Sequence, residues 1–137
     1  MSSSFINYNE NIPMQLSQEE LRRYFELYKE GNLEARNTII THNMRLVFST
    51  AKRFSFNSNY LSDYISVGMI GLVKAVDNFD YEKNVKFSTF AVNCIANEIF
   101  MYMRKEKRFY KNKISMEQNN YEEPEINLND RLFDYRD

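Results

Sequence analysis

Apolar residues recur along most of the chain at intervals of three and four positions, which is the spacing of one face of an α-helix. The clearest stripe consists of Ile40, Met44, Val47, Ala51 and Phe54. With only three glycines and two prolines in 137 residues, little interrupts this periodicity. The pattern predicts an all-α fold, a compact bundle of about four helices.

Capping and turn residues set the expected limits of these helices. Ser17 and Glu20 have the spacing of a capping box, in which each side chain accepts from the backbone N–H of the other residue. Gly31 is expected to end the first helix, because glycine tolerates the left-handed backbone that closes many helices. The four helices are expected at about 18–30, 33–54, 63–79 and 89–108.

Two glycines, Gly68 and Gly71, lie inside the third expected helix. Each costs about 1 kcal/mol relative to alanine in a helix interior. Such a pair is typical of a helix whose backbone is approached closely by another helix or by a partner. We therefore expect a tight contact at this point.

The formal net charge of −1 conceals an uneven distribution. Residues 104–113 carry six basic side chains and one acidic one, whereas residues 114–137 carry two basic and seven acidic. A basic stretch can concentrate a polyanion even on an acidic chain. We divide the chain into a flexible N-terminus at 1–16, a helical domain at 17–113 and, at 114–137, a flexible acidic tail or a linker to a further domain.

The sequence lacks the residue patterns of an enzyme or a metal site. A single histidine, His42, and a single cysteine, Cys94, cannot form a structural zinc site or an internal disulfide. A Gly-rich phosphate loop and a nucleophile elbow are both absent. We expect a protein without catalytic residues, metal or cofactor. Because the sequence shows neither a secretory signal nor a membrane span, we expect it in the cytoplasm.

Residues 86–113 combine aromatic, amide and basic side chains. Asn93 and Asn97 are four positions apart and share a helical face, with Phe90 one turn earlier. Aromatic rings stack on unpaired bases, and lysine and arginine hold phosphates, so this combination suits single-stranded nucleic acid. The pattern alone also fits core aromatics followed by a solvated basic helix end.

The same part of the chain resembles the second conserved region of the sigma factors of bacterial RNA polymerase. The motifs of this region follow one another in the same order as in the family. They are an acidic residue, a glycine, IGL, KAV, a Phe-Asp pair, and KFST followed by an aromatic residue. The matching positions are Asp63, Gly68, 70–72, 74–76, Phe79, Asp80 and 86–90. The likeness covers about 17–113, and the segment around Cys94 is most similar to the sporulation-type alternative sigma factors.

The resemblance implies two binding sites. The helix expected from residue 63 is similar to the part that docks on the clamp coiled coil of core RNA polymerase, with an exposed edge at Asp63, Ser66, Met69 and Val73. The following segment is similar to the part that melts the minus-ten promoter element and captures flipped bases of the non-template strand. The matching residues are Phe79, Lys83, Lys86, Phe87, Thr89, Phe90, Asn93 and Asn97. Asn97 and Phe100 stand where the family's readers of the duplex minus-ten element are expected, so the promoter sequence should differ from the housekeeping one. The basic run adds phosphate contacts at Arg104, Lys105, Lys107 and Arg108.

Some positions depart from the family pattern. Housekeeping members carry two tryptophans where this chain has Asn93 and Cys94, which puts unaided promoter melting in doubt. The third and fourth conserved regions are not recognisable after residue 113, so the sequence fits a shortened form, one half of a split gene or a natural minimal factor. The main expectation is an initiation factor module. The alternative is an interaction protein that binds polymerase without opening promoters. An anti-sigma factor is a further candidate partner.

Overall fold

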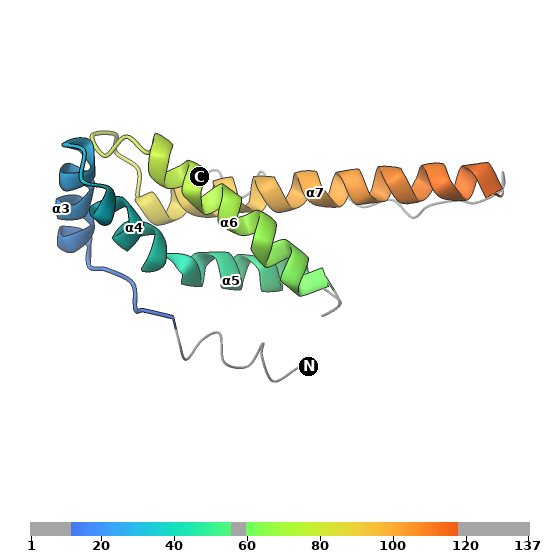
Figure 1. Ribbon diagram of the computed structural model, residues 1–137, viewed down its shortest axis with the longest axis horizontal. Helices are drawn as coiled ribbons and strands as arrows, with labels where there is room; N and C mark the ends of the chain where they lie inside the picture. Colours follow the sequence, from blue (N-terminus) through green and yellow to red (C-terminus); the bar gives the residue numbers. More distant parts are fainter. Residues whose placement is uncertain (1–11, 56–59, 118–137) are drawn as a thin grey trace.

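The computed structural model describes residues 12–55 and 60–117, which form an all-α bundle without strands in these two ranges (Figure 1). The prediction of an all-α fold is confirmed. The helices are α3 (Gln18–Lys29), α4 (Leu33–Thr41), α5 (Met44–Phe54), α6 (Leu61–Asn78) and α7 (Phe87–Glu117). None of the described helices is long and apolar enough to cross a membrane.

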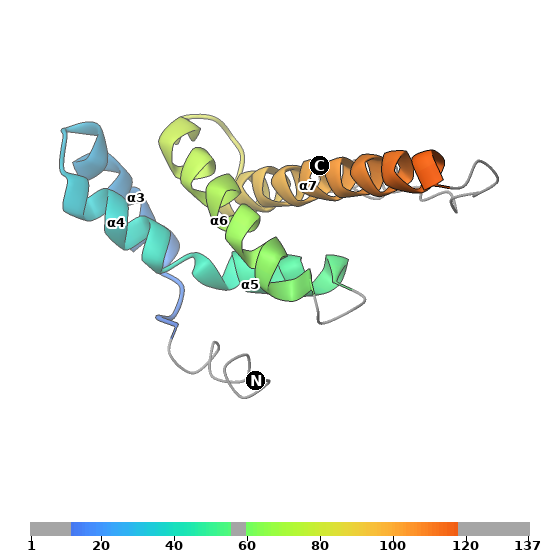
Figure 2. The ribbon, with the colours of Figure 1, turned by 45° about the vertical axis from the view of Figure 1, so that its right-hand side comes forward.

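Helices α5, α6 and α7 enclose the main core, and α3 and α4 form a hairpin at one end (Figures 1 and 2). The most deeply buried side chains include Val47 on α5, Leu72 on α6 and Ile95 and Ile99 on α7. The C-terminal part of α7 extends beyond the other helices (Figure 2). One surface of α7 is therefore built into the bundle while the far part of the helix projects from it.

The two glycines of α6 lie where this helix crosses α7. A Cβ atom built on Gly71 would lie 2.6 Å from the carbonyl oxygen of Cys94 and 2.7 Å from the Cα of Ile95. A Cβ on Gly68 would lie 3.0 Å from Cγ1 of Val47, a side-chain atom. The predicted close approach is confirmed, and the backbone of α7 itself makes it.

The second expected helix is in fact two helices, α4 and α5, so its prediction as one element was wrong. The buried side chain of Asn43 donates a hydrogen bond of 2.7 Å to the carbonyl of Ile39, which a continuous helix would pair with the Asn43 backbone N–H. That N–H bonds to Ile40 O instead, at 3.1 Å. Asparagine side chains compete with helical hydrogen bonds in this way, and apolar periodicity does not reveal the break.

The residues just before α3 are held against the joint between α4 and α5. Ile12 is buried, and Arg45 donates to its carbonyl at 3.1 Å. The Nδ1 atom of His42 lies 2.8 Å from the carbonyl oxygen of Met14. Residues 12–16, expected to be flexible, therefore pack on the bundle, while 1–11 lie outside the described residues.

Helix α7 is longer than expected, because it begins at Phe87 and continues to Glu117. The expected acidic tail therefore begins inside a helix, and its residues 118–137 lie outside the described part of the chain. Helix α6 starts at Leu61 rather than at residue 63. The capping box at Ser17 and Glu20 is present as predicted, with both hydrogen bonds formed.

Candidate DNA and polymerase surfaces

Aromatic rings cluster around the connection between α6 and α7. The ring of Phe79 has its centroid 5.2 Å from that of Phe87 and 5.5 Å from that of Phe90. Phe25 of α3 lies 5.4 Å from Phe79, and Tyr81 lies 5.6 Å from it. Such separations are those of favourable aromatic pairs. The connection is thus fixed to the bundle by its rings.

The three expected stacking residues are not equally accessible. Phe87 is only 2% exposed and belongs to the core, so we remove it from the surface available to a base. Phe79 and Phe90 are half-buried. Thr89 is also half-buried. Sequence resemblance could not separate Phe87 from Phe90, because only packing decides which ring turns inward.

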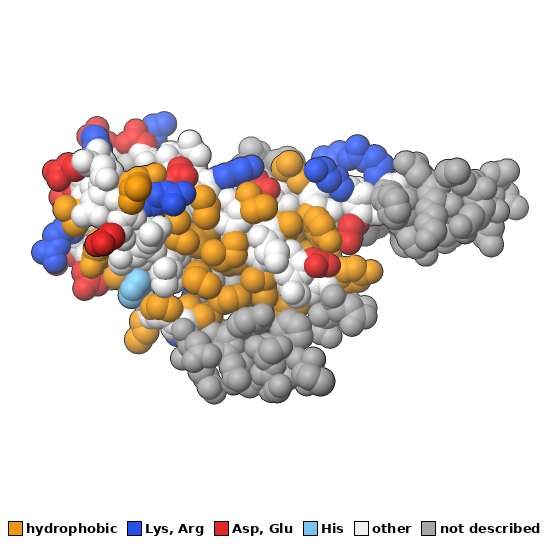
Figure 3. Space-filling view, viewed as in Figure 1, with side chains coloured by type: hydrophobic (Ala, Val, Ile, Leu, Met, Phe, Trp, Pro, Cys, Tyr) orange, Lys and Arg blue, Asp and Glu red, His pale blue; other side chains and the backbone are white. Residues whose placement is uncertain are grey.

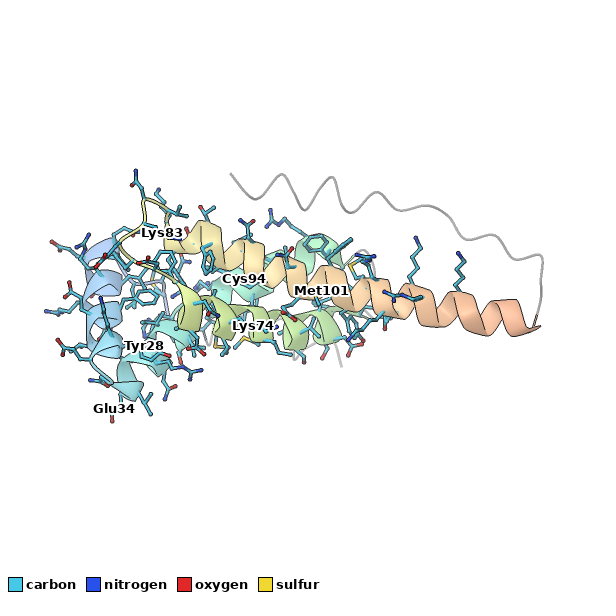
Figure 4. All side chains as sticks on the ribbon, turned by 90° about the horizontal axis from the view of Figure 1, so that it is seen from above. Tyr28, Glu34, Lys74, Lys83, Cys94 and Met101 are labelled. Carbon is cyan, nitrogen blue, oxygen red and sulfur yellow. The ribbon has the colours of Figure 1, made fainter. Side chains whose placement is uncertain are left out.

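The connection itself is a tight, polar turn. The side chain of Asp80 accepts from the Glu82 N–H at 3.0 Å, and its carbonyl accepts from the Lys83 N–H at 3.1 Å. Lys83 and Lys86 are exposed, and Lys83 is seen on the loop in Figure 4. The turn therefore presents two of the predicted cations beside the partly exposed rings.

A surface pocket of about 520 Å³ lies between this turn and the first part of α3. Arg22 of α3 was not predicted, yet it lines the pocket with its guanidinium 5.1 Å from the Tyr81 ring centroid. The other lining residues are Gln18, Glu19, Phe79, Tyr81, Lys83, Asn84, Val85, Lys86 and Phe87. Three cations, one carboxylate (Glu19) and the side chain of Phe79 thus line this hollow. The sequence separation of Arg22 from the turn concealed its contribution.

Along α7 the predicted DNA-binding residues divide into exposed and half-buried ones. Asn97, Arg104, Lys105 and Arg108 are exposed, whereas Phe100 and Lys107 are half-buried. Asn93 is also half-buried, and its Oδ1 atom is buried without a hydrogen-bond partner. Asn93 and Asn97 therefore do not form one exposed amide surface, contrary to the expectation from their spacing.

Met101 is a further exposed residue of α7 that sequence reasoning missed. It is 50% exposed and lies one turn after Asn97, with Arg104 and Arg108 continuing the same helical face. The Arg104 guanidinium lies 5.4 Å from the ring centroid of Phe100, and Figure 4 shows Met101 well along α7 from Lys83. This face, made of Asn97, Met101, Arg104 and Arg108, is called the α7 face below.

The edge of α6 expected to dock on polymerase is partly exposed. Asp63 and Ser66 are exposed, whereas Met69 and Val73 are half-buried. Ile70 is 49% exposed and was not predicted, although it lies four positions after Ser66 on the same face. Figure 3 shows hydrophobic side chains gathered over α6 and the neighbouring helices. An exposed isoleucine within such a surface is a typical mark of a protein contact.

The start of this edge carries concentrated negative charge. Burial, a hydrogen bond with Glu106 and the charge of that carboxylate raise the pKa of Tyr102 to about 12, and Asp63 adds to the effect. Burial, followed by the charge of Glu106, raises the pKa of Tyr64 as well. Both phenols stay neutral at physiological pH, so the carboxylates set the charge.

The remaining titratable side chains point to structural roles. Burial raises the pKa of the Cys94 thiol, so Cys94 packs as an apolar residue and not as a reactive thiolate. Lys74 pairs with Glu98 at 2.6 Å and joins α6 to α7. Among the described residues no group of three or more metal-ligating side chains is arranged to hold an ion.

A second polar contact joins the α3–α4 hairpin to the end of α6. Arg36 donates two hydrogen bonds to Asp77, at 2.8 and 3.0 Å, and the Tyr28 hydroxyl donates a third at 2.7 Å. The bond from Arg36 holds the pKa of the Asp77 carboxyl below its usual value. This contact is called the Asp77 clip below.

The clip predicts a pH-dependent stability. A carboxyl group whose pKa is lowered on folding stabilises the folded state at pH values above its pKa in the unfolded chain, about 3.9. This stabilisation is lost as the pH falls through the pKa of the folded state. Because the Asp77 side chain is 35% exposed, solvent screens the contact, and we expect Asp77→Asn to cost only about 1 kcal/mol at pH 7. Thermal melts should show a gap of about 4 °C that closes below about pH 4. A gap that persists in acid contradicts the assignment.

The fold and these surfaces together define a class: a small helical module with a basic, aromatic surface at the α6–α7 connection and a separate, partly apolar edge on α6. The family model described as Sigma-70 region 2 matches residues 39–109, a little more than half of the chain. The chain belongs to that family, and the predicted resemblance to sporulation-type sigma factors is confirmed. Sigma factors are initiation factors and not enzymes, which confirms the prediction of a non-enzymatic protein.

Several curated proteins are similar to the chain. The RNA polymerase sigma-28 factor of Bacillus thuringiensis subsp. kurstaki is 41% identical over 106 residues, which are 76% of this chain and 45% of that protein. The RNA polymerase sigma-G factor of Bacillus subtilis (strain 168) is 47% identical over 90 residues, 65% of this chain and 35% of that protein. The sigma-K factor of the same strain is 41% identical over 91 residues, 66% of this chain and 31% of that protein. The chain thus spans less than half the length of these relatives.

Proposed function

We propose that the chain is a sigma factor module for transcription initiation, which binds core RNA polymerase and captures the non-template strand of the minus-ten promoter element. The observation that carries the DNA half is the pocket between α3 and the α6–α7 connection, where Arg22, Lys83 and Lys86 surround the partly exposed ring of Phe79. Stacking contributes about 1–3 kcal/mol per base and can offset the cost of unstacking it from the duplex. Family membership supports the assignment.

Within this proposal, the described residues have distinct tasks. The rings of Phe79 and Phe90 stack on captured bases, while the α7 face meets the neighbouring duplex. Exposed cations neutralise phosphates without reading sequence. The proposed DNA-binding set is Arg22, Phe79, Lys83, Lys86, Thr89, Phe90, Asn97, Phe100, Met101, Arg104, Lys105, Lys107 and Arg108.

The polymerase half of the proposal rests on the edge of α6. Asp63 and Ser66 supply polar contacts, and Ile70 with the flanking Met69 and Val73 supplies the apolar centre. The clamp coiled coil of core polymerase is the proposed partner. This edge and the DNA surface involve different side chains, so substitutions can separate the two activities.

Ile70→Ala tests the docking edge. Truncating an exposed apolar anchor at an interface is expected to weaken core-polymerase binding about tenfold. The melting temperature should hardly change, since surface substitutions usually alter stability by less than about 0.5 kcal/mol. A titration against core polymerase gives the affinity, and Leu33→Ala, which removes an exposed leucine on α4, is the matched control. Equal affinities for the parent and the Ile70 variant would remove Ile70 from the interface.

The phosphate contacts predict a salt dependence. Alanine at Arg104, Lys105 or Arg108 should each lower the slope of log affinity against log salt by about 0.7–0.9 for promoter DNA bound by the holoenzyme. The loss should be nearly independent of sequence. Arg23→Ala, an exposed arginine of α3 that does not line the pocket, should keep the parent slope. Unchanged slopes in the α7 variants would make the basic run a solvated helix end.

A second candidate function is polymerase binding without promoter opening. One observation favours it: Asn93 and Cys94 are half-buried, so this part of α7 exposes no aromatic wedge at the positions where housekeeping members carry tryptophan. Pull-down with core polymerase followed by cross-linking to single-stranded promoter oligonucleotides separates the candidates. Both predict polymerase binding, and only the first predicts cross-links to the minus-ten strand.

A further inference from the structure

Helix α4 of the α3–α4 hairpin packs on α6, whereas α3 meets the end of α6, the α6–α7 connection and the start of α7. The Asp77 clip fixes the end of α6 two residues before Phe79. Lys29, at the end of α3, lies 3.9 Å from the Glu82 carboxylate. Near the start of α3, the Tyr81 hydroxyl donates to the carbonyl of Gln18 at 3.2 Å. Both ends of α3 are thus tied to the same short turn.

Between these polar contacts, Phe25 packs against three rings of the aromatic cluster. Its ring centroid lies 5.4 Å from that of Phe79, 5.5 Å from that of Tyr81 and 5.2 Å from that of Phe87. Phe25 is 7% exposed, so its own ring is not offered to a ligand. The ring centroid of Phe79 lies in turn 5.5 Å from that of Phe90. A continuous series of ring contacts runs from α3 to the proposed capture surface.

The turn has few other supports. Its internal hydrogen bonds are local, within residues 80–85, and Glu82, Lys83, Asn84, Val85 and Lys86 are all exposed. Val85 is an apolar residue of the turn and is 50% exposed. The rings of Phe79 and Tyr81 therefore fix the turn: Phe79 contacts Phe87 and Phe90 of α7, and Phe25 packs against both Phe79 and Tyr81 from the side of α3.

We propose that Phe25 is a positioning residue for base capture: through its ring contacts with Phe79 and Tyr81, α3 sets the geometry in which Phe79 and Phe90 receive an unpaired base. This inference rests on the proposed function. Phe25 touches no DNA and lies away from the docking edge of α6. It couples the hairpin to single-strand binding and leaves polymerase binding unaffected.

A matched pair of substitutions tests the proposal. Phe25→Leu removes the ring contacts, and Phe54→Leu alters a phenylalanine of α5 that is 6% exposed and makes no described ring contact with Phe79 or Phe90. Each variant, bound to core polymerase, is titrated with a single-stranded minus-ten oligonucleotide that carries 2-aminopurine at the captured adenine. Melting temperature and polymerase affinity are measured on the same preparations.

Both variants are expected to lower the melting temperature by similar amounts and to keep the parent affinity for polymerase. Phe25→Leu should weaken oligonucleotide binding about tenfold and reduce the fluorescence quenching at saturation, which reports stacking of the bound base. Phe54→Leu should change neither. Tyr28→Phe, which removes only the hydroxyl bond to Asp77, should weaken binding about twofold and keeps the test decisive if Phe25→Leu unfolds at the assay temperature.

The failures are distinguishable. If the parent complex gives no oligonucleotide signal, the proposed function itself is wrong, and the positioning role falls with it. If the parent binds and the two leucine variants lose affinity equally, or neither does, only the role of Phe25 is overturned. The role of Phe25 is also overturned if Phe25→Leu quenches the fluorescence as the parent does. Where Phe25→Leu cannot be assayed, parent-like affinity in Tyr28→Phe overturns it.

Discussion

Gly71→Ala is expected to be the most destabilising single-methyl change in this protein. The added Cβ would lie 2.6–2.7 Å from backbone atoms of Cys94 and Ile95, which cannot rotate away as a side chain can. Helices α6 and α7 must separate to accept it, and overpacking of a core costs about 1–3 kcal/mol or more. The higher helix propensity of alanine offsets about 1 kcal/mol of this loss of stability. We expect a net loss of about 2 kcal/mol and a melting temperature about 8 °C lower.

Gly68→Ala is the matched control for this prediction. It lies on the same helix, but its added Cβ would meet side-chain atoms of Val47 and Ile95 at 3.0 and 3.2 Å, and these can shift by a few tenths of an ångström. Thermal melts of the two variants should therefore differ clearly, with Gly68→Ala near the parent. Equal melting temperatures would show that the crossing of α6 and α7 is looser than its backbone distances indicate.

Phe90→Ala is expected to produce the largest loss of single-strand binding. The half-buried ring contacts Phe79 and is proposed to stack on a captured base, so its removal should cost about 1–3 kcal/mol, or about 5- to 150-fold in affinity for the minus-ten oligonucleotide. Fluorescence anisotropy with the polymerase-bound chain measures this loss. Phe90→Tyr keeps an aromatic ring and should retain the parent affinity.

The result must be separated from a packing effect. If Phe90 acts mainly as a core residue, its truncation should lower the melting temperature and weaken polymerase binding together with DNA binding. Phe54→Ala, which changes a core ring of α5 outside the proposed DNA-binding set, should lower the melting temperature and spare the single-strand affinity. A Phe90→Ala variant that binds the oligonucleotide as the parent does would refute the capture role.

Part of the candidate site could be predicted from sequence alone. Lys83, Lys86, Asn97, Arg104 and Arg108 are exposed as expected, because polar and charged side chains on a turn or a helix surface rarely bury. The roles of aromatic residues were harder to predict, since the same residue type occurs both in a core and on a stacking surface. Phe87 and Phe90 lie three positions apart, yet one is in the core and the other reaches the surface.

The amino-acid sequence by itself determined the all-α class, the capping of α3 and the close approach at Gly71, because helical periodicity, side-chain caps and glycine's lack of a Cβ are local properties. Only the tertiary structure decided where Asn43 breaks a helix, that Arg22 lines the pocket with Lys83, and that Phe25 supports Phe79. The Asn43 bond is local but competes with the helix only through a side chain that packing buries. The other two features join residues more than fifty positions apart, and they exist only after α3 has packed against the α6–α7 connection.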